Sequence, residues 1–196
     1  MAADLLRGRL AIVDVETTGG DPLRDRVIEI ALIELDQGEE TGRWSCLINP
    51  GIAVPRVIED LTGIGGRMLV DAPKFAEIAG CLLQRLSARL FIAHNARFDF
   101  GFLANEFARA GLDYDAPTLC TVRLSRRLYP KHRRHNLDAL IARHGLSCGE
   151  RHRAMGDAEA LLQFLRTARE ECGPDVIAEA LRRLAVRPVP QRPENA

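Results

Sequence analysis

The sequence predicts an α/β fold in which a mixed β-sheet is flanked by helices. Three strand-like apolar runs come first and are joined by short loops, which is typical of an antiparallel meander. An alternation of strand and helix follows, which is typical of a layered α/β domain. With 196 residues, 46% of them apolar and 28% charged, the chain suits one domain with a substantial core.

The first three strands are predicted over residues 9–15, 27–36 and 42–49. Their connections, TGGDPLRD and QGEET, carry the Gly, Pro and Asp residues of tight loops. Apolar residues then recur with a 3.6-residue period, which predicts a helix over residues 75–86. The run LFIAHN predicts a further strand over residues 90–95.

The second half of the chain is predicted to be mostly helical. The expected elements are a helix over residues 98–111, a short strand over 118–121, and helices over 122–129, 137–144, 157–172 and 175–186. Asn136 is placed to cap the helix that starts at residue 137. We expect one domain over residues 1–186 and a disordered, Pro-rich tail over residues 187–196, RPVPQRPENA.

Composition excludes several classes of protein. The chain has no apolar stretch of 18 residues, and charges interrupt every apolar run near its N-terminus, so neither a membrane span nor a standard signal peptide is expected. Its five cysteines are scattered and form no CxxC pair, which indicates reduced thiols. The sequence therefore predicts a cytoplasmic protein with no membrane partner.

Charge is unevenly distributed, although the formal net charge is zero. Residues 123–153 hold nine basic residues against only Asp138 and Glu150. A basic surface of this kind can follow a single-stranded backbone, or it can be a solvated helix face, and both interpretations stay open. The basic residues in its first part are Arg123, Arg126, Arg127, Lys131, Arg133 and Arg134.

Four acids stand in unusual surroundings. Asp14 and Glu16, in IVDVETTGG, lie two residues apart on a predicted strand and so share a face, where burial of like charges is costly. Asp99 stands between two phenylalanines, and Asp157 lies in the first turn of an apolar-faced helix. Taken alone, each acid has a simpler interpretation as a strand end that reaches solvent or as a first-turn helix residue.

Together, the four acids indicate a metal site. The carboxyl ends of strands are where sites form in open α/β sheets, and hard oxygen ligands suit Mg²⁺ or Mn²⁺. His152, which alone would be interpreted as a solvated residue, could then act as a general base. A zinc site is not expected, because the spacing of His132, His135, His144, Cys148 and His152 matches no zinc module.

Three motifs in order, DVETTG, HNARFD and HRAMGD, resemble those of the DEDDh family of 3′–5′ exonucleases. Within this family the chain resembles the epsilon (DnaQ-like) proofreading subunit of bacterial DNA polymerase III, over about residues 10–164. The resemblance implies an RNase H-like fold with a five-stranded mixed sheet and helices on both faces. It also implies that Asp14, Glu16, Asp99 and Asp157 hold two Mg²⁺ or Mn²⁺ ions and that His152 is the base.

The same resemblance implies how a substrate is held. The backbone around Thr17 and Thr18 would approach the terminal nucleotide, and Leu61, Thr62 and Ile64 would wedge against its base. Asn95 is a further implied substrate contact.

The implied activity is hydrolysis of single-stranded DNA from its 3′ end, in proofreading or repair, with release of nucleoside 5′-monophosphates. An exoribonuclease of the same family and a non-catalytic nucleic-acid or polymerase adaptor remain as alternatives. The chain contains no recognisable clamp-binding motif, so we expect a stand-alone nuclease or one domain of a longer protein, with a DNA polymerase or another replication or repair protein as a possible partner.

Overall fold

The computed structural model describes residues 8–186 and has a five-stranded sheet with the strand order β3-β2-β1-β4-β5. β1 pairs antiparallel with β2 and parallel with β4, so the sheet is mixed, as the sequence predicts. β2 also pairs antiparallel with β3, and β4 pairs parallel with β5. The strands are β1 (Leu10–Thr17), β2 (Val27–Asp36), β3 (Glu39–Leu47), β4 (Leu90–Ala93) and β5 (Thr118–Cys120).

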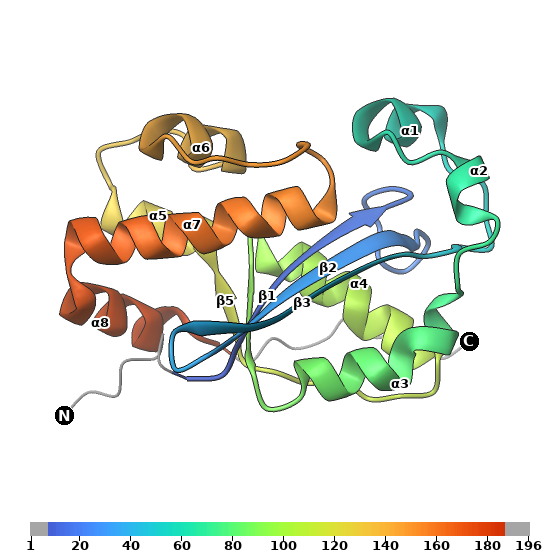
Figure 1. Ribbon diagram of the computed structural model, residues 1–196, viewed down its shortest axis with the longest axis horizontal. Helices are drawn as coiled ribbons and strands as arrows, with labels where there is room; N and C mark the ends of the chain where they lie inside the picture. Colours follow the sequence, from blue (N-terminus) through green and yellow to red (C-terminus); the bar gives the residue numbers. More distant parts are fainter. Residues whose placement is uncertain (1–7, 187–196) are drawn as a thin grey trace.

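Helices cover both faces of this sheet (Figure 1). The helices are α1 (Arg56–Thr62), α2 (Gly66–Leu69), α3 (Phe75–Leu86), α4 (Ala96–Arg109), α5 (Thr121–Leu128), α6 (Leu137–His144), α7 (Ala154–Cys172) and α8 (Pro174–Leu184). The last four pack together on one face, and α3 and α4 pack on the other. Within residues 8–186, no helix combines the length and apolar content that crossing a membrane requires.

The two cores follow the alternation of side chains along β1. Leu10 and Ile12 pack in the core beneath α7, whereas Ala11 and Val13 pack in the core that contains α3 and α4. Because the strand alternates with a period of two, Asp14 and Glu16 continue the α7 face. The apolar half of β1 thus fixes the direction in which its two acids point.

Local geometry at the end of β1 opens room for a site. β4 has four residues and β1 has eight, so β1 extends past the end of its parallel neighbour. The β1–β2 register then shifts from Glu16 opposite Glu29 to Thr17 opposite Val27, which leaves Ile28 as the extra residue of a bulge. Bulges and the carboxyl ends of parallel strands are both common beside active sites.

Several predicted boundaries were wrong. Helices α1 and α2 were not predicted, because α1 is short and exposed and buries only Thr62. Helix α7 starts at Ala154, three residues before the predicted start. Asn136 occupies the N-cap position of α6, but its side chain makes no capping hydrogen bond. The tail predicted over residues 187–196 lies outside the described residues, so the domain limits stay a prediction.

Candidate active site

The four acids singled out in the sequence come from three elements and act on one another electrostatically. Asp14 and Glu16 lie near the end of β1, Asp99 lies in the first turn of α4, and Asp157 lies in the first turn of α7. Asp99 and Asp157 are buried, and the two acids of β1 are half-buried. The fold therefore gathers acids that are 143 residues apart at most in the chain.

Burial and repulsion by neighbouring charges favour the protonated form of Asp14, Glu16 and Asp99. Burial, followed by the charges of Asp99 and Asp157, raises the pKa of Asp14 well above its ordinary value. Burial and then the charge of Asp157 raise the pKa of Glu16 to about 7. The pKa of Asp99 is raised to about 8, mainly by burial. Such shifts are typical of a site that expects a compensating positive charge.

One carboxylate oxygen of Asp99 accepts a hydrogen bond, and the other accepts none from the residues that the structure describes. The backbone N–H of Val15 donates to Asp99 Oδ1 across 3.3 Å. Asp99 Oδ2 is buried and makes no hydrogen bond to any residue that the structure describes. A buried carboxylate oxygen without a donor is costly, so its position among other acids suits a cation ligand.

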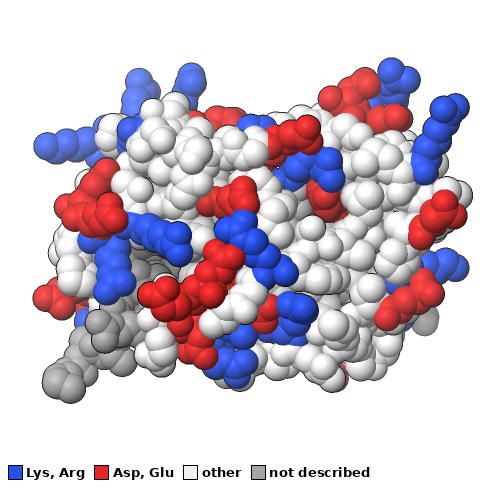
Figure 2. Space-filling view, viewed as in Figure 1, with Lys and Arg blue, Asp and Glu red and all other residues white. Residues whose placement is uncertain are grey.

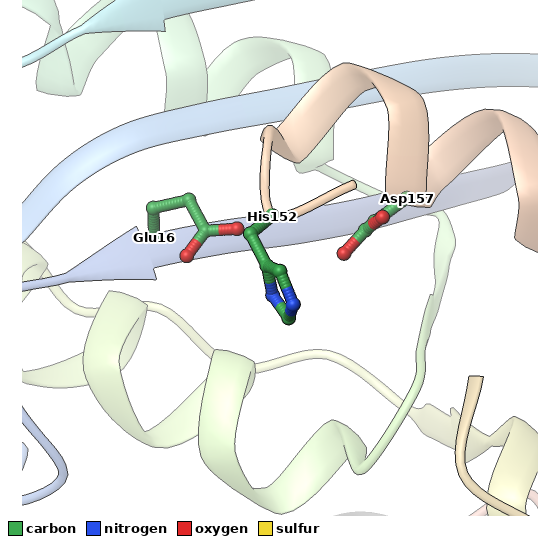
Figure 3. Close-up of side chains that lie close together, drawn as sticks. All are labelled: Glu16, His152 and Asp157. Atoms are coloured by element: carbon green, nitrogen blue, oxygen red, sulfur yellow. The ribbon is translucent and has the colours of Figure 1, made fainter. Parts of the chain in front are cut away.

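His152 lies between two of the acids, as Figure 3 shows. One ring nitrogen of His152 and one carboxylate oxygen each from Glu16 and Asp157 lie within 4.8 Å of one another. His152 has a positive φ of 57°, a conformation that is uncommon for residues other than glycine. The loop must therefore be held by its neighbours.

The arginines on either side of His152 anchor its loop, and neither was predicted to have a role in the site. Arg151 donates to Asp157 and also to Asp138 of α6, with an Nε–Oδ1 distance of 2.9 Å. Arg153 binds Glu29 of β2, with an Nη2–Oε1 distance of 2.8 Å. One feature of the sequence could have indicated the contact with Arg153: Glu29 is an acid within the otherwise apolar run VIEIALIEL.

A glycine lets the same loop lie against α7. The motif HRAMGD places Gly156 in the first turn of the helix. A Cβ at Gly156 would collide with the carbonyl oxygen of Glu150. The close approach of loop and helix, which brings His152 toward Asp157, therefore requires glycine at this position.

The residues predicted to contact substrate differ in how exposed they are. Thr17 and Thr18 are buried, the Thr18 hydroxyl accepts from the N–H of Arg26, and the Thr18 N–H donates to the Arg26 carbonyl. Leu61 is exposed, whereas Thr62 is buried and Ile64 packs with Ile28 and Leu69. Asn95 is exposed and takes a left-handed φ of 71° at the start of α4.

The ligand atoms gathered here fit Mg²⁺ or Mn²⁺ better than zinc. The cluster offers carboxylate oxygens and one imidazole, which suits Mg²⁺ or Mn²⁺. Two other histidines have partners elsewhere: His135 contacts Ser125, and His144 contacts Glu171. Among residues 8–186, Glu16, His152 and Asp157 are the one group of three such side chains whose ligand atoms all lie within 4.8 Å of one another.

A basic surface lies on the same side of the sheet. The six basic side chains of residues 123–134 are all exposed. Blue side chains project at the upper left of Figure 2, where Figure 1 places α6 and the neighbouring loops. This distribution matches the charge asymmetry that the sequence predicts.

Comparisons with known proteins agree with this geometry. The model of the exonuclease family RNase_T matches residues 11–165. The chain is 30% identical over 173 residues to the DNA polymerase III subunit epsilon of Aquifex aeolicus, which covers 87% of this chain and 85% of that protein. It is 37% identical over 183 residues to the 3′–5′ exonuclease DinG of Bacillus subtilis, which covers 90% of this chain but only 19% of DinG.

A solved structure shares the fold. Exonuclease I of E. coli in complex with a dT13 oligonucleotide superposes with a TM-score of 0.78 at 19% identity, covering 88% of this chain and 43% of that one. This likeness confirms the predicted RNase H-like exonuclease fold.

Proposed function

Because the chain belongs to the exonuclease family whose model matches residues 11–165, we propose that it is a metal-dependent 3′–5′ exonuclease acting on single-stranded DNA. The observation that carries the proposal is the convergence of Asp14, Glu16, Asp99 and Asp157 with His152. The expected products are nucleoside 5′-monophosphates, and the expected role is proofreading or repair.

The four acids would hold two Mg²⁺ or Mn²⁺ ions. When bound, the ions neutralise charge on the scissile phosphate and lower the pKa of an attacking water. The acids would hold the ions beside the scissile phosphate. Asp99 Oδ2 would supply one ligand oxygen, because it accepts no hydrogen bond from the described part of the protein. His152 would take the proton from the attacking water through a ring nitrogen, because its ring lies beside Glu16 and Asp157.

Groups around the acids, of which Leu61 and Asn95 are exposed, support the proposed binding of a strand end. The backbone at Thr17 and Thr18 would approach the terminal nucleotide, and Leu61 would contact its base. Asn95 is a further proposed contact. The basic surface of residues 123–134 would hold the backbone of the strand by salt-dependent, sequence-independent contacts.

The proposal of DNA as substrate is supported by the oligonucleotide bound to exonuclease I and by the polymerase named in the epsilon relative. An exoribonuclease would use the same acids, since the 2′-hydroxyl is recognised by details of the pocket. We also propose a replication or repair partner, such as a DNA polymerase. A cytoplasmic location is proposed because all five cysteines are free thiols.

A time course on 5′-labelled single-stranded DNA and RNA of matched sequence tests the proposal. We expect a ladder that shortens from the 3′ end with Mg²⁺ or Mn²⁺ and stops with EDTA, and faster cleavage of DNA. Faster cleavage of RNA would favour the exoribonuclease. Folded protein that binds the strand but cleaves neither substrate with either metal would favour the adaptor and contradict the proposal.

A further inference from the structure

We infer that Glu29 is a positioning residue for this site, acting through Arg153 and the first turn of α7 to hold His152 and Asp157 over β1. The inference rests on the proposed function and extends it to a residue outside the acid cluster.

Four hydrogen bonds converge on the Glu29 carboxylate, one of them a longer bond from Arg153 Nε to Oε1 across 3.3 Å. Arg153 donates from Nη2 to Oε1 across 2.8 Å and from Nε to Oε2 across 3.1 Å. The backbone N–H of Ala154, the first residue of α7, donates to Oε2 across 2.9 Å. A paired guanidinium and a helix N-terminus both favour a charged carboxylate, so Glu29 ties the loop and the helix together.

This contact orients the segment that carries two of the proposed catalytic side chains. His152 has a left-handed φ and directly precedes Arg153, and Asp157 follows Ala154 by less than one helical turn. Strained backbone persists only where neighbouring contacts determine it. Since the capping position of α7, Arg153, makes no side-chain capping bond of its own, the cap comes from Glu29 on β2.

The position of Glu29 in the sheet links this brace to the remaining acids. Glu29 lies directly opposite Glu16 in the β1–β2 register, and opposite residues of an antiparallel pair point to the same face. The strand pair that carries Asp14 and Glu16 therefore also holds the loop of His152. The charge of Glu29 raises the pKa of Glu16 and the charge of Arg153 lowers it, so the ion pair braces the loop with little change in net charge beside the acids.

The same strand offers a matched control. Glu34 is also buried on β2, with 8% of its surface exposed against 5% for Glu29. It pairs with Arg85 across 2.6 Å and with Arg89 across 3.3 Å. Because Glu34 lies toward the other end of the strand and on the opposite face, Glu34→Gln removes a comparable buried charge without touching the loop of His152.

The experiment compares Glu29→Gln, Arg153→Lys and Glu34→Gln with the unsubstituted protein. It measures the melting temperature in EDTA, Mn²⁺ binding by calorimetry, and kcat and KM on single-stranded DNA at a temperature far below melting. We expect Glu29→Gln to lower kcat by about 10- to 100-fold and to weaken Mn²⁺ binding, with KM nearly unchanged. Arg153→Lys keeps the charge but loses the paired geometry, so its loss should be smaller.

Glu34→Gln should lower the melting temperature and leave kcat and Mn²⁺ binding as they are. The double variant Glu29→Gln/Arg153→Lys should lose little more than Glu29→Gln alone, because both changes act on one contact. If Glu29→Gln does not fold, Arg153→Lys and its Mn²⁺ isotherm decide the question.

A Glu29→Gln protein with the kcat and Mn²⁺ affinity of Glu34→Gln would overturn the inference, since Glu29 would then act on stability only. Failure of the proposed function is a separate result: the unsubstituted protein would cleave neither DNA nor RNA with any metal.

Discussion

Buried acids near the two ends of β2 differ in how completely they are paired. Toward one end, Glu34 is matched by two arginines, Arg85 and Arg89. Toward the other end, Glu29 is paired with Arg153, but of the neighbouring cluster of Asp14, Glu16, Asp99 and Asp157 only Asp157 forms an ion pair within residues 8–186, with Arg151. An acid that serves the fold is paired where it is buried, whereas acids left to repel one another indicate a site for a cation.

The largest effect is expected from the acid at the centre of the unpaired cluster. Asp14→Asn should lower the cleavage rate by about 10³-fold or more, because a ligand shared by the proposed metal site is lost. The same change should keep or raise the melting temperature in EDTA, because repulsion with Asp99 and Asp157 is relieved. Rate measurements and thermal melts check both parts, and a lower melting temperature would contradict the repulsion argument.

His152→Asn tests whether the imidazole moves a proton. Asn tolerates the left-handed φ of 57° better than most residues, so the loop should be retained. We expect the cleavage rate to fall by about 10²- to 10⁴-fold, the usual contribution of a general base, with little change in melting temperature. Cleavage at the normal rate would remove His152 from the mechanism.

The pH dependence of stability distinguishes unpaired from paired acids. The folded pKa values of Glu16, about 7, and Asp99, about 8, lie above those of the unfolded chain, so the folded state binds more protons between about pH 4 and pH 8. The stability contributed by these protons is present below about pH 4 and is lost as the pH rises through 7 to 8. In EDTA we expect stability to fall by several kcal/mol from pH 5 to pH 8.

Denaturant melts at several pH values measure this trend. Asp14→Asn is the matched variant and should flatten the curve, since it removes one of the repelling charges. Added Mn²⁺ should also flatten it, because a bound cation favours the ionised acids. Stability that rises over the same interval in EDTA would mean that the acids are not crowded as described.

The smallest effect is expected outside both regions, on the basic surface. The double change Lys131→Gln/Arg133→Gln removes two exposed charges and should weaken binding of single-stranded DNA a few-fold at moderate salt. The slope of log affinity against log salt should fall by about 1.4. Fluorescence anisotropy across a salt series measures both, and an unchanged slope would favour the solvated-face interpretation. The pH trend of stability in EDTA should stay as it is.

Much of the site could be predicted because its signals are local. The two-residue spacing of Asp14 and Glu16 on a strand already fixes a shared face, and Asp99 and Asp157 stand out as acids at the starts of apolar helices. The helices over residues 75–86 and 137–144 were predicted with the observed bounds, since their apolar periodicity is complete. Helix α1 was not predicted, because a short, exposed helix shows little periodicity in its apolar residues.

What the sequence by itself determined is therefore the strands and helices, because these follow from periodicity along the chain, whereas the choice of the four acids and His152 as a proposed site also used the resemblance of their motifs to a known family. Only the tertiary structure decided which charges meet. The bulge at Ile28 and the contacts of Arg151 with Asp157 and Asp138 depend on how the elements pack, and the brace from Glu29 to Arg153 joins residues that are 124 positions apart. Such pairings depend on the packing of α7 against β1 and β2, where the free energy of burying or pairing a charge is set by neighbours that no local pattern specifies.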